Sequence, residues 1–111
     1  MDATVTDIDG HLALRVRLTE SYYPSDLSAG LLVRWYTNDD CKIRYREHHG
    51  VTDWEQRWDR HPNSHNTRDH LHPPPDAPTH GEDPGWPVDY REMTKLVLDA
   101  VEERIAELRA E

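Results

Sequence analysis

The sequence predicts an α+β domain, in which an antiparallel meander of four to five strands carries one C-terminal helix on one face. Three observations predict this fold. Apolar and polar residues alternate in several short segments, as expected of strands with one buried face. Short polar turns join these segments, which favours antiparallel neighbours. Apolar residues then recur at helical spacing near the end of the chain. A chain of 111 residues supports one modest core, so residues 1–111 are expected to form a single domain.

The strands are expected within residues 4–59. A short strand at 5–8 ends at Asp9-Gly10, which is a hairpin signal. Further strands are predicted at 12–18, 29–36, 41–46 and 52–59, and their inward positions are apolar. These positions are Leu12, Leu14, Val16, Leu18, Leu31, Val33, Trp35, Cys41, Ile43, Tyr45, Trp54 and Trp58.

Residues 60–87 are predicted to be a loop, because they hold seven of the eight prolines and show no periodicity. A helix is predicted over 88–109. Asp89 and Glu92 have the spacing of a capping box at its start. Its apolar stripe is expected to pack on the sheet first and to offer a homodimer interface second. The stripe consists of Met93, Leu96, Val97, Ala100, Val101, Ile105 and Leu108.

The composition points to an acidic protein of the cell interior. The formal net charge is -9, and only Lys42 and Lys95 among the 13 basic residues are lysine. An Asp/Glu-rich, Lys-poor surface indicates a halophile, where acidic side chains keep a protein soluble in salt. Cys41 is the only cysteine, so no intramolecular disulfide can form. We find no signal peptide and no apolar run long enough to cross a bilayer, so a cytoplasmic location is expected.

Residues 57–75 are the candidate functional segment. Four of the chain's eight histidines fall there, interleaved with arginine, aspartate and asparagine. The segment offers almost nothing to a core, and long polar loops in small domains are where sites tend to lie.

One interpretation of these histidines is a metal site. Two of them are four residues apart, and another two are two apart, which places the latter pair on one side of an extended segment. Three or four imidazoles with a nearby carboxylate would suit Zn²⁺ or another first-row divalent ion. The candidate ligands are His61, His65, His70 and His72, with Asp59 and Asp69 close by.

A second interpretation is a metal-independent ribonuclease. That chemistry needs a base for the RNA 2′-hydroxyl, an acid for the leaving 5′-oxygen and a cation for the phosphorane charge. Imidazole suits the first two tasks near neutral pH, and Arg contacts phosphate through two hydrogen bonds. The candidate catalytic residues are His65, His70, His72 and Asp59. Asp59 would orient one of the histidines through its Nδ1. The candidate substrate-binding residues are Arg68, Arg57, Arg44, Arg46 and Asn63, with the three strand arginines on outward faces.

A third interpretation assigns the segment no function, because histidine, proline and asparagine also solvate loops and cap turns. For any one histidine this is the simpler account, whereas for the cluster a function is favoured. The pair His48-His49 beside Gly50 is explained either by a turn or by a contribution to the site. Trp58 is expected in the core rather than as a base-stacking platform, since it shares a face with Trp54.

The run Trp58-Asp59-Arg60, followed by His61, His65 and a His70-x-His72 pair, resembles the TumE-type toxin family of small prokaryotic proteins. The resemblance implies an antiparallel sheet, a histidine-rich loop and a C-terminal helix. It also implies one half of a toxin–antitoxin module, with a cognate antitoxin and an RNA target. Two features depart from that family: Arg60 stands where Asn is usual, and the surface is acidic.

The sequence therefore favours a toxin with RNA-directed, endoribonuclease-like activity. In this hypothesis His70 or His72 is the base, the other is the acid, and Arg68 clamps the phosphate. The alternative is a non-catalytic metal-binding or protein-interaction domain of a haloarchaeal family.

Overall fold

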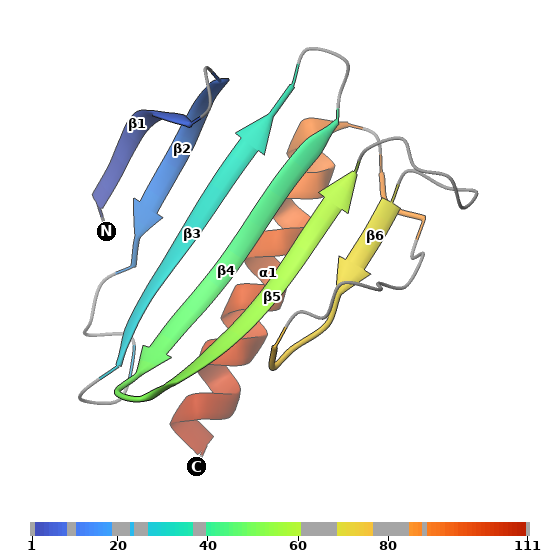
Figure 1. Ribbon diagram of the computed structural model, residues 1–111. Coiled ribbons are helices and arrows are strands. Elements are labelled where there is room, and N and C mark those ends of the chain that lie inside the picture. The colour runs from blue at the N-terminus through green and yellow to red at the C-terminus, as the bar shows by residue number, and fades with distance from the viewer. Residues whose placement is uncertain are drawn as a thin grey trace.

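The computed structural model shows one antiparallel sheet backed by one helix (Figure 1). It describes residues 2–8, 11–18, 23, 27–36, 40–60, 69–76, 85–87 and 89–110. Within these residues the sheet has six strands in the order of the chain. The strands are β1 (Asp2–Ile8), β2 (His11–Arg17), β3 (Ser28–Trp35), β4 (Cys41–His49), β5 (Thr52–Arg60) and β6 (Asp69–His72), and the helix is α1 (Tyr90–Ala110). The helix lies behind β3, β4 and β5 in Figure 1.

The predicted α+β meander is confirmed, with one more strand than expected. The additional strand is β6, inside the segment 60–87 for which the sequence shows no periodicity. Its four residues are too few to display alternation by themselves. Leu71 lies opposite Trp58 of β5, so β6 is defined by its pairing and not by its own composition.

The link between β4 and β5 sets the register of the centre of the sheet. His49 and Thr52 are paired, and only Gly50 and Val51 separate them. Gly50 has a φ of 70°, a left-handed conformation that favours glycine in two-residue hairpin turns. This turn places His48 directly opposite Asp53 and Arg46 opposite Glu55.

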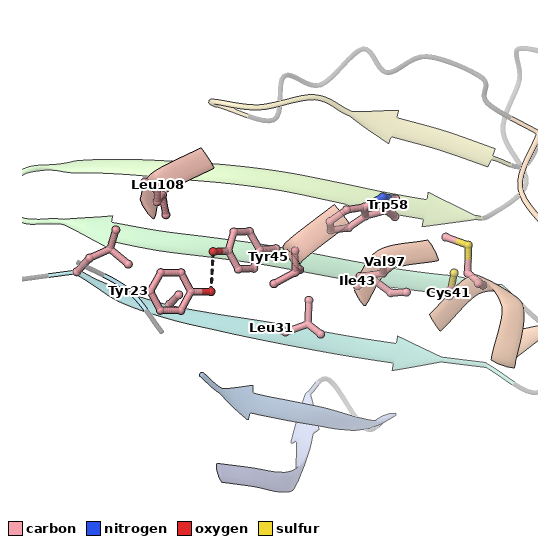
Figure 2. Close-up of a cluster of buried hydrophobic side chains, with 12 residues drawn as sticks. Tyr23, Leu31, Cys41, Ile43, Tyr45, Trp58, Val97 and Leu108 are labelled. Carbon is pink, nitrogen blue, oxygen red and sulfur yellow. Dashed lines mark hydrogen bonds between the residues drawn. The ribbon is translucent and has the colours of Figure 1, made fainter. Parts of the chain in front are cut away.

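The core fills the space between α1 and the facing side of β3–β5. Figure 2 shows this cluster, with Tyr23 and Tyr45 joined by a hydrogen bond of 2.9 Å between their hydroxyls. Cys41 is fully buried and Trp58 is only 2% exposed, so both predictions of core positions are confirmed. Burying a side chain of this kind contributes about 1.5–3 kcal/mol. The buried residues of this cluster are Tyr23, Leu27, Ala29, Leu31, Cys41, Ile43, Tyr45, Trp58, Met93, Val97, Val101 and Leu108.

The helix begins where the sequence places its cap. The Asp89 carboxylate accepts hydrogen bonds from the backbone N–H groups of Arg91 (2.8 Å) and Glu92 (3.2 Å). These contacts satisfy N–H groups that have no partner inside the helix. The predicted stripe also faces the sheet, since Met93, Val97, Val101 and Leu108 are the buried helical residues.

The first hairpin extends beyond the helix. Val5 and Leu12 are 69% and 72% exposed, although strand alternation turns both toward the helix side of the sheet. Figure 1 shows β1 and β2 to one side of the strands that α1 covers. The helix therefore buries the central strands and leaves this part of the same face open.

One polar cluster crosses the core. Glu47 of β4 is fully buried, and Arg104 of α1 donates to both of its carboxylate oxygens at 2.9 Å. Tyr45 donates to Glu47 at 2.6 Å, and His49 Nε2 lies 2.7 Å from it. The Arg104 guanidinium also lies 4.1 Å from the centre of the Trp54 ring. Sheet and helix are thus joined by a charged pair with several partners.

These partners decide the protonation state of the cluster. Burial alone would raise the pKa of the Glu47 carboxyl, but the hydrogen bonds from Arg104, Tyr45 and His49 lower that pKa below its usual value. Burial, together with the bond to Glu47, raises the pKa of the Tyr45 hydroxyl. Glu47 is therefore an anion and Tyr45 a neutral donor at neutral pH.

Replacing Arg104 by methionine should destabilise the fold by about 3–5 kcal/mol, because the Glu47 carboxylate would stay buried without its cation. Urea denaturation measures this loss. Arg109→Met, at the exposed last turn of the same helix, should change stability by less than about 0.5 kcal/mol. Equal effects at the two positions would contradict the assignment. Adding Glu47→Gln to Arg104→Met should restore part of the lost stability, since no uncompensated charge remains.

Because the pKa of Glu47 is lowered in the folded state, its contribution to stability is present above its unfolded pKa and is lost as pH falls. A Glu47→Gln variant should accordingly lose less stability between pH 5 and pH 3, taken as about the range in which carboxyls titrate.

Candidate nucleic-acid interface

Most of the positive charge gathers on the face of the sheet that α1 does not cover, called here the open face. The residues of β4 that point into the core are Cys41, Ile43, Tyr45 and Glu47, so the residues between them point outward. Strand pairing carries this alternation across the sheet. Seven of the chain's 13 basic residues thus share the open face: Arg15, Arg17, Arg34, Lys42, Arg44, Arg46 and Arg57.

Negative charge on the open face is sparse by comparison. Within β2–β5 it carries three carboxylates, Asp53, Glu55 and Asp59, all on β5. Seven cations against three carboxylates leave a net charge of +4 there, in a chain whose formal net charge is -9. The fold therefore separates charge, with a basic surface on an acidic protein.

Two shallow grooves run along the open face. The first, the hairpin groove, has a volume of about 330 Å³ and includes Arg17, Gly30, Arg46 and His48. The second, the Asp59 groove, has a volume of about 320 Å³ and includes Arg34, Lys42, Arg57 and Asp59. Arg15, Leu32 and Arg44 line both grooves. The two grooves are therefore adjacent, and together they are called here the track.

Only some of these cations are engaged by carboxylates. Arg44 lies 3.2 Å from Glu55, and Arg46 lies 2.6 Å from Asp53. In the part of the chain that the structure describes, no carboxylate lies within ion-pair distance of the remaining cations of β2–β4. These are Arg15, Arg17, Arg34 and Lys42. Their charge is available to an anion that enters the grooves.

Asp59 and His72 form a histidine–carboxylate pair at one end of the track. Asp59 Oδ2 lies 3.1 Å from His72 Nε2, and the side chains are only 12% and 8% exposed. The sequence hypothesis had Asp59 contact a histidine through Nδ1, whereas the contact here is through Nε2. The diagonal register explains this pairing, because His72 lies opposite Arg57 while Asp59 lies opposite His70. The pair links β5 to β6.

A second histidine–carboxylate pair lies at the other end, beside the hairpin groove. His48 Nδ1 lies 2.8 Å from Asp53 Oδ1, and these side chains are 52% and 38% exposed. Asp53 also receives the hydrogen bond from Arg46 at 2.6 Å. Those two bonds, with Arg46 first, lower the pKa of the Asp53 carboxyl, so Asp53 is an anion near neutral pH. The sequence left His48 between a turn role and a site role, and the structure places it in β4, opposite Asp53.

The outward positions expected for Arg44, Arg46 and Arg57 are confirmed, and Asp59 and His72 do lie together. His61, Asn63, His65 and Arg68 lie outside the described residues. His70 is placed in the backbone of β6, but its side chain is not among those described. Among the described residues no group of three or more His, Cys, Asp or Glu side chains is arranged to hold a metal ion. The zinc interpretation and the role of Arg68 therefore stay predictions.

Arg60 explains one departure from the family pattern. Its side chain is 2% exposed and lies on the helix side of the sheet, where it donates a hydrogen bond to the backbone carbonyl of Pro87. Arg60 thus ties the end of β5 to the segment that precedes α1. It holds the fold and does not belong to the open face.

Comparison with known protein families gives a match over most of the chain. A family model described as Toxin TumE matches residues 4–105. Searches of curated proteins and of solved structures found no match. Within the described residues no helix is long and apolar enough to span a membrane. The match covers nearly the whole chain, and this chain belongs to the TumE toxin family.

Proposed function

We propose that this toxin acts on RNA and that the open face of its sheet binds the phosphate backbone. Membership in a toxin family implies a cognate antitoxin as its partner in general. The observation that carries the RNA proposal is the concentration of seven cations on one sheet face of an acidic chain. Contacts of this kind supply most of the sequence-independent affinity of proteins for nucleic acids.

The shape and chemistry of the track fit a single strand held by its backbone. The grooves share a middle section at Arg15 and Arg44, so one extended chain can follow both. Guanidinium groups match phosphate through paired hydrogen bonds. Trp54 and Trp58 lie on the helix side, and β2–β5 present no aromatic side chain on the open face for base stacking. The proposed contact is therefore to phosphates rather than to base edges.

The proposed reaction is metal-independent cleavage at the Asp59 end of the track. A histidine takes the proton of the 2′-hydroxyl, and the 2′-oxygen attacks the phosphorus. A second imidazole donates a proton to the departing 5′-oxygen, which leaves a 2′,3′-cyclic phosphate and a 5′-hydroxyl. His70 and His72 are the proposed base and acid, with His65 as a further candidate and Asp59 as the positioning residue. Support comes from the contact between Asp59 and His72 next to the basic Asp59 groove.

Reversing charge in the Asp59 groove should weaken RNA binding. The double variant Arg34→Glu/Lys42→Glu should lower affinity by roughly tenfold or more and reduce its salt dependence, since two phosphate contacts are lost. Fluorescence anisotropy with a labelled single-stranded RNA measures both quantities. A matched control is Lys95→Glu/Arg109→Glu, which makes the same charge change on exposed positions of α1. Equal weakening by both double variants would mean that net charge, and not the open face, governs binding.

The histidine pair of β6 should be required for cleavage. In His70→Ala/His72→Ala, RNA cleavage should fall by about a hundredfold or more, which is the usual contribution of general acid–base catalysis. Release of a 5′-hydroxyl product, followed on gels, measures the rate. RNA binding and the thermal transition are measured on the same variant, because His72 is buried. Near wild-type cleavage by a folded variant would exclude these histidines from the reaction.

Chelation should leave the reaction unchanged. If imidazoles alone move the protons, RNA cleavage after treatment with EDTA should match that of untreated protein. Elemental analysis of the same samples gives the metal content. Stoichiometric zinc that disappears in His70→Ala/His72→Ala, with cleavage lost on chelation, would instead support the metal-binding alternative.

A further inference from the structure

The polar side chains that line the hairpin groove are nearly all cationic or hydrogen-bond donors. Its polar side chains are those of Arg15, Arg17, Ser28, Arg44, Arg46 and His48. No carboxylate is among the described residues that line it. In a chain with 22 acidic residues, four arginines and a histidine around one hollow form a local concentration of hydrogen-bond donors. Such a hollow suits an anion with several acceptor oxygens.

Gly30 keeps the floor of the groove low. It lies between Arg17 of β2 and Arg46 of β4 in one row across the sheet. Neighbouring strands are about 4.8 Å apart, so the two arginine backbones lie about 10 Å from each other with no side chain between them. Two guanidinium groups reaching over this gap can meet one phosphate from opposite sides.

The backbone of Gly30 does not itself demand glycine, since its φ is not in the left-handed region. A Cβ added there would lie 3.3 Å from the Val16 carbonyl oxygen and would project toward the open face. Glycine within a strand weakens the strand, and such positions often mark the close approach of a ligand or of another backbone segment.

Asp53 orients the donors at the hairpin end of the groove. One of its oxygens contacts His48 Nδ1 at 2.8 Å, and the other accepts from Arg46 at 2.6 Å. With Nδ1 engaged, Nε2 is the nitrogen that His48 can offer to a ligand. The Nε of Arg46 is buried and has no hydrogen-bond partner within the described structure. An orphaned buried donor of this kind is costly unless a ligand or water satisfies it.

We propose that the hairpin groove is a phosphate-binding subsite. Arg17 and Arg46 flank the phosphate over Gly30, and His48 contacts it from the hairpin side. Asp53 is the positioning residue for both His48 and Arg46. The shared chemistry is a phosphate group, and the assignment of that group to an RNA strand rests on the proposed function above.

The location of the subsite predicts a dependence on substrate length. Asp53 and Asp59 are six residues apart on β5, which corresponds to about 20 Å along an extended strand. A phosphate in the hairpin groove therefore belongs to a nucleotide several positions away from the Asp59–His72 pair. Only an RNA that is long enough can occupy both ends of the track.

The test measures binding of two kinds of probe to the full chain: inorganic phosphate, and single-stranded RNAs of two and of twelve nucleotides. Phosphate binding is followed by NMR shifts of the backbone amides of residues 28–30 and 46–48. Arg17→Ala and His48→Ala should each weaken phosphate binding by roughly tenfold, because a charged hydrogen bond is lost. The same variants should weaken binding of the twelve-nucleotide RNA more than binding of the dinucleotide, because only the longer RNA can occupy both ends of the track at once. Gly30→Ala should also weaken binding of phosphate and of the twelve-nucleotide RNA, because its methyl group partly fills the groove. Thermal melting checks that this variant is as stable as wild type.

Two controls separate this subsite from general attraction to basic surface. Arg109→Ala removes an exposed helical arginine and should change neither probe's affinity. Arg34 lines the Asp59 groove, so Arg34→Ala should weaken RNA binding and leave phosphate binding in the hairpin groove unchanged. Unchanged phosphate binding in folded Arg17→Ala and His48→Ala would overturn the subsite. So would equal losses for RNAs of both lengths.

The outcomes also separate the subsite from the RNA proposal. Phosphate binding that is lost in the variants, with no RNA binding by wild type, would keep the phosphate site and remove RNA as its source. RNA affinity that stays unchanged in Arg17→Ala, His48→Ala and Gly30→Ala would support the RNA proposal and overturn the subsite.

Discussion

The buried pair of Glu47 and Arg104 is the constraint on which the arrangement of this domain depends. A carboxylate with no exposed surface in β4 needs a cation, and Arg104 of the helix supplies one. Two parallel hydrogen bonds, a tyrosine donor and a tryptophan face fix the guanidinium in one position. The pair thereby selects which side of the sheet the helix covers. It also holds the C-terminal half of α1 over β4 and β5, so the opposite side of those strands is left for other contacts.

Because the helix covers one face of the sheet, the alternation of residues along each strand places most cations on the opposite face. In β4 the inward residues are apolar or paired in the core, whereas Lys42, Arg44, Arg46 and His48 point the other way. A shift of register by one residue would bury these cations and expose the core, so the same pattern that stabilises the fold also fixes the basic face. An acidic net charge does not oppose this arrangement, because the helix carries five carboxylates and the carboxylates of β2–β5 on the open face are confined to β5.

The periodicity of apolar residues in the sequence was sufficient to predict five of the six strands, the helix, the core positions of Cys41 and Trp58 and the outward positions of Arg44, Arg46 and Arg57. It did not predict that β2 and β3 add their arginines to the same surface. That conclusion needs the order of the strands, which pairing between distant segments decides. The strand β6 was not predicted for a similar reason, since a segment of four residues is too short to show a periodic pattern of apolar residues. His48 was within reach, because a two-residue turn at Gly50 defines which residue of β5 lies opposite it. The density of histidines in residues 57–75 does not show which side chains are in contact.

The two histidine–carboxylate pairs on the open face suit different tasks because their exposure differs. His72 and Asp59 are nearly buried between β5 and β6, so their contact holds the neighbouring strand and the residues that follow it in place. His48 and Asp53 are half exposed at the rim of a groove, where an oriented imidazole can meet a ligand directly. The choice of arginine over lysine fits both ends of the track, since six of the seven cations of the open face are arginine. Screening by salt weakens point charges, whereas paired hydrogen bonds from a planar, weakly hydrated guanidinium depend on geometry as well as on charge. A face built from arginines and grooves can therefore retain a phosphate at ionic strengths that would release it from a flat surface of lysines.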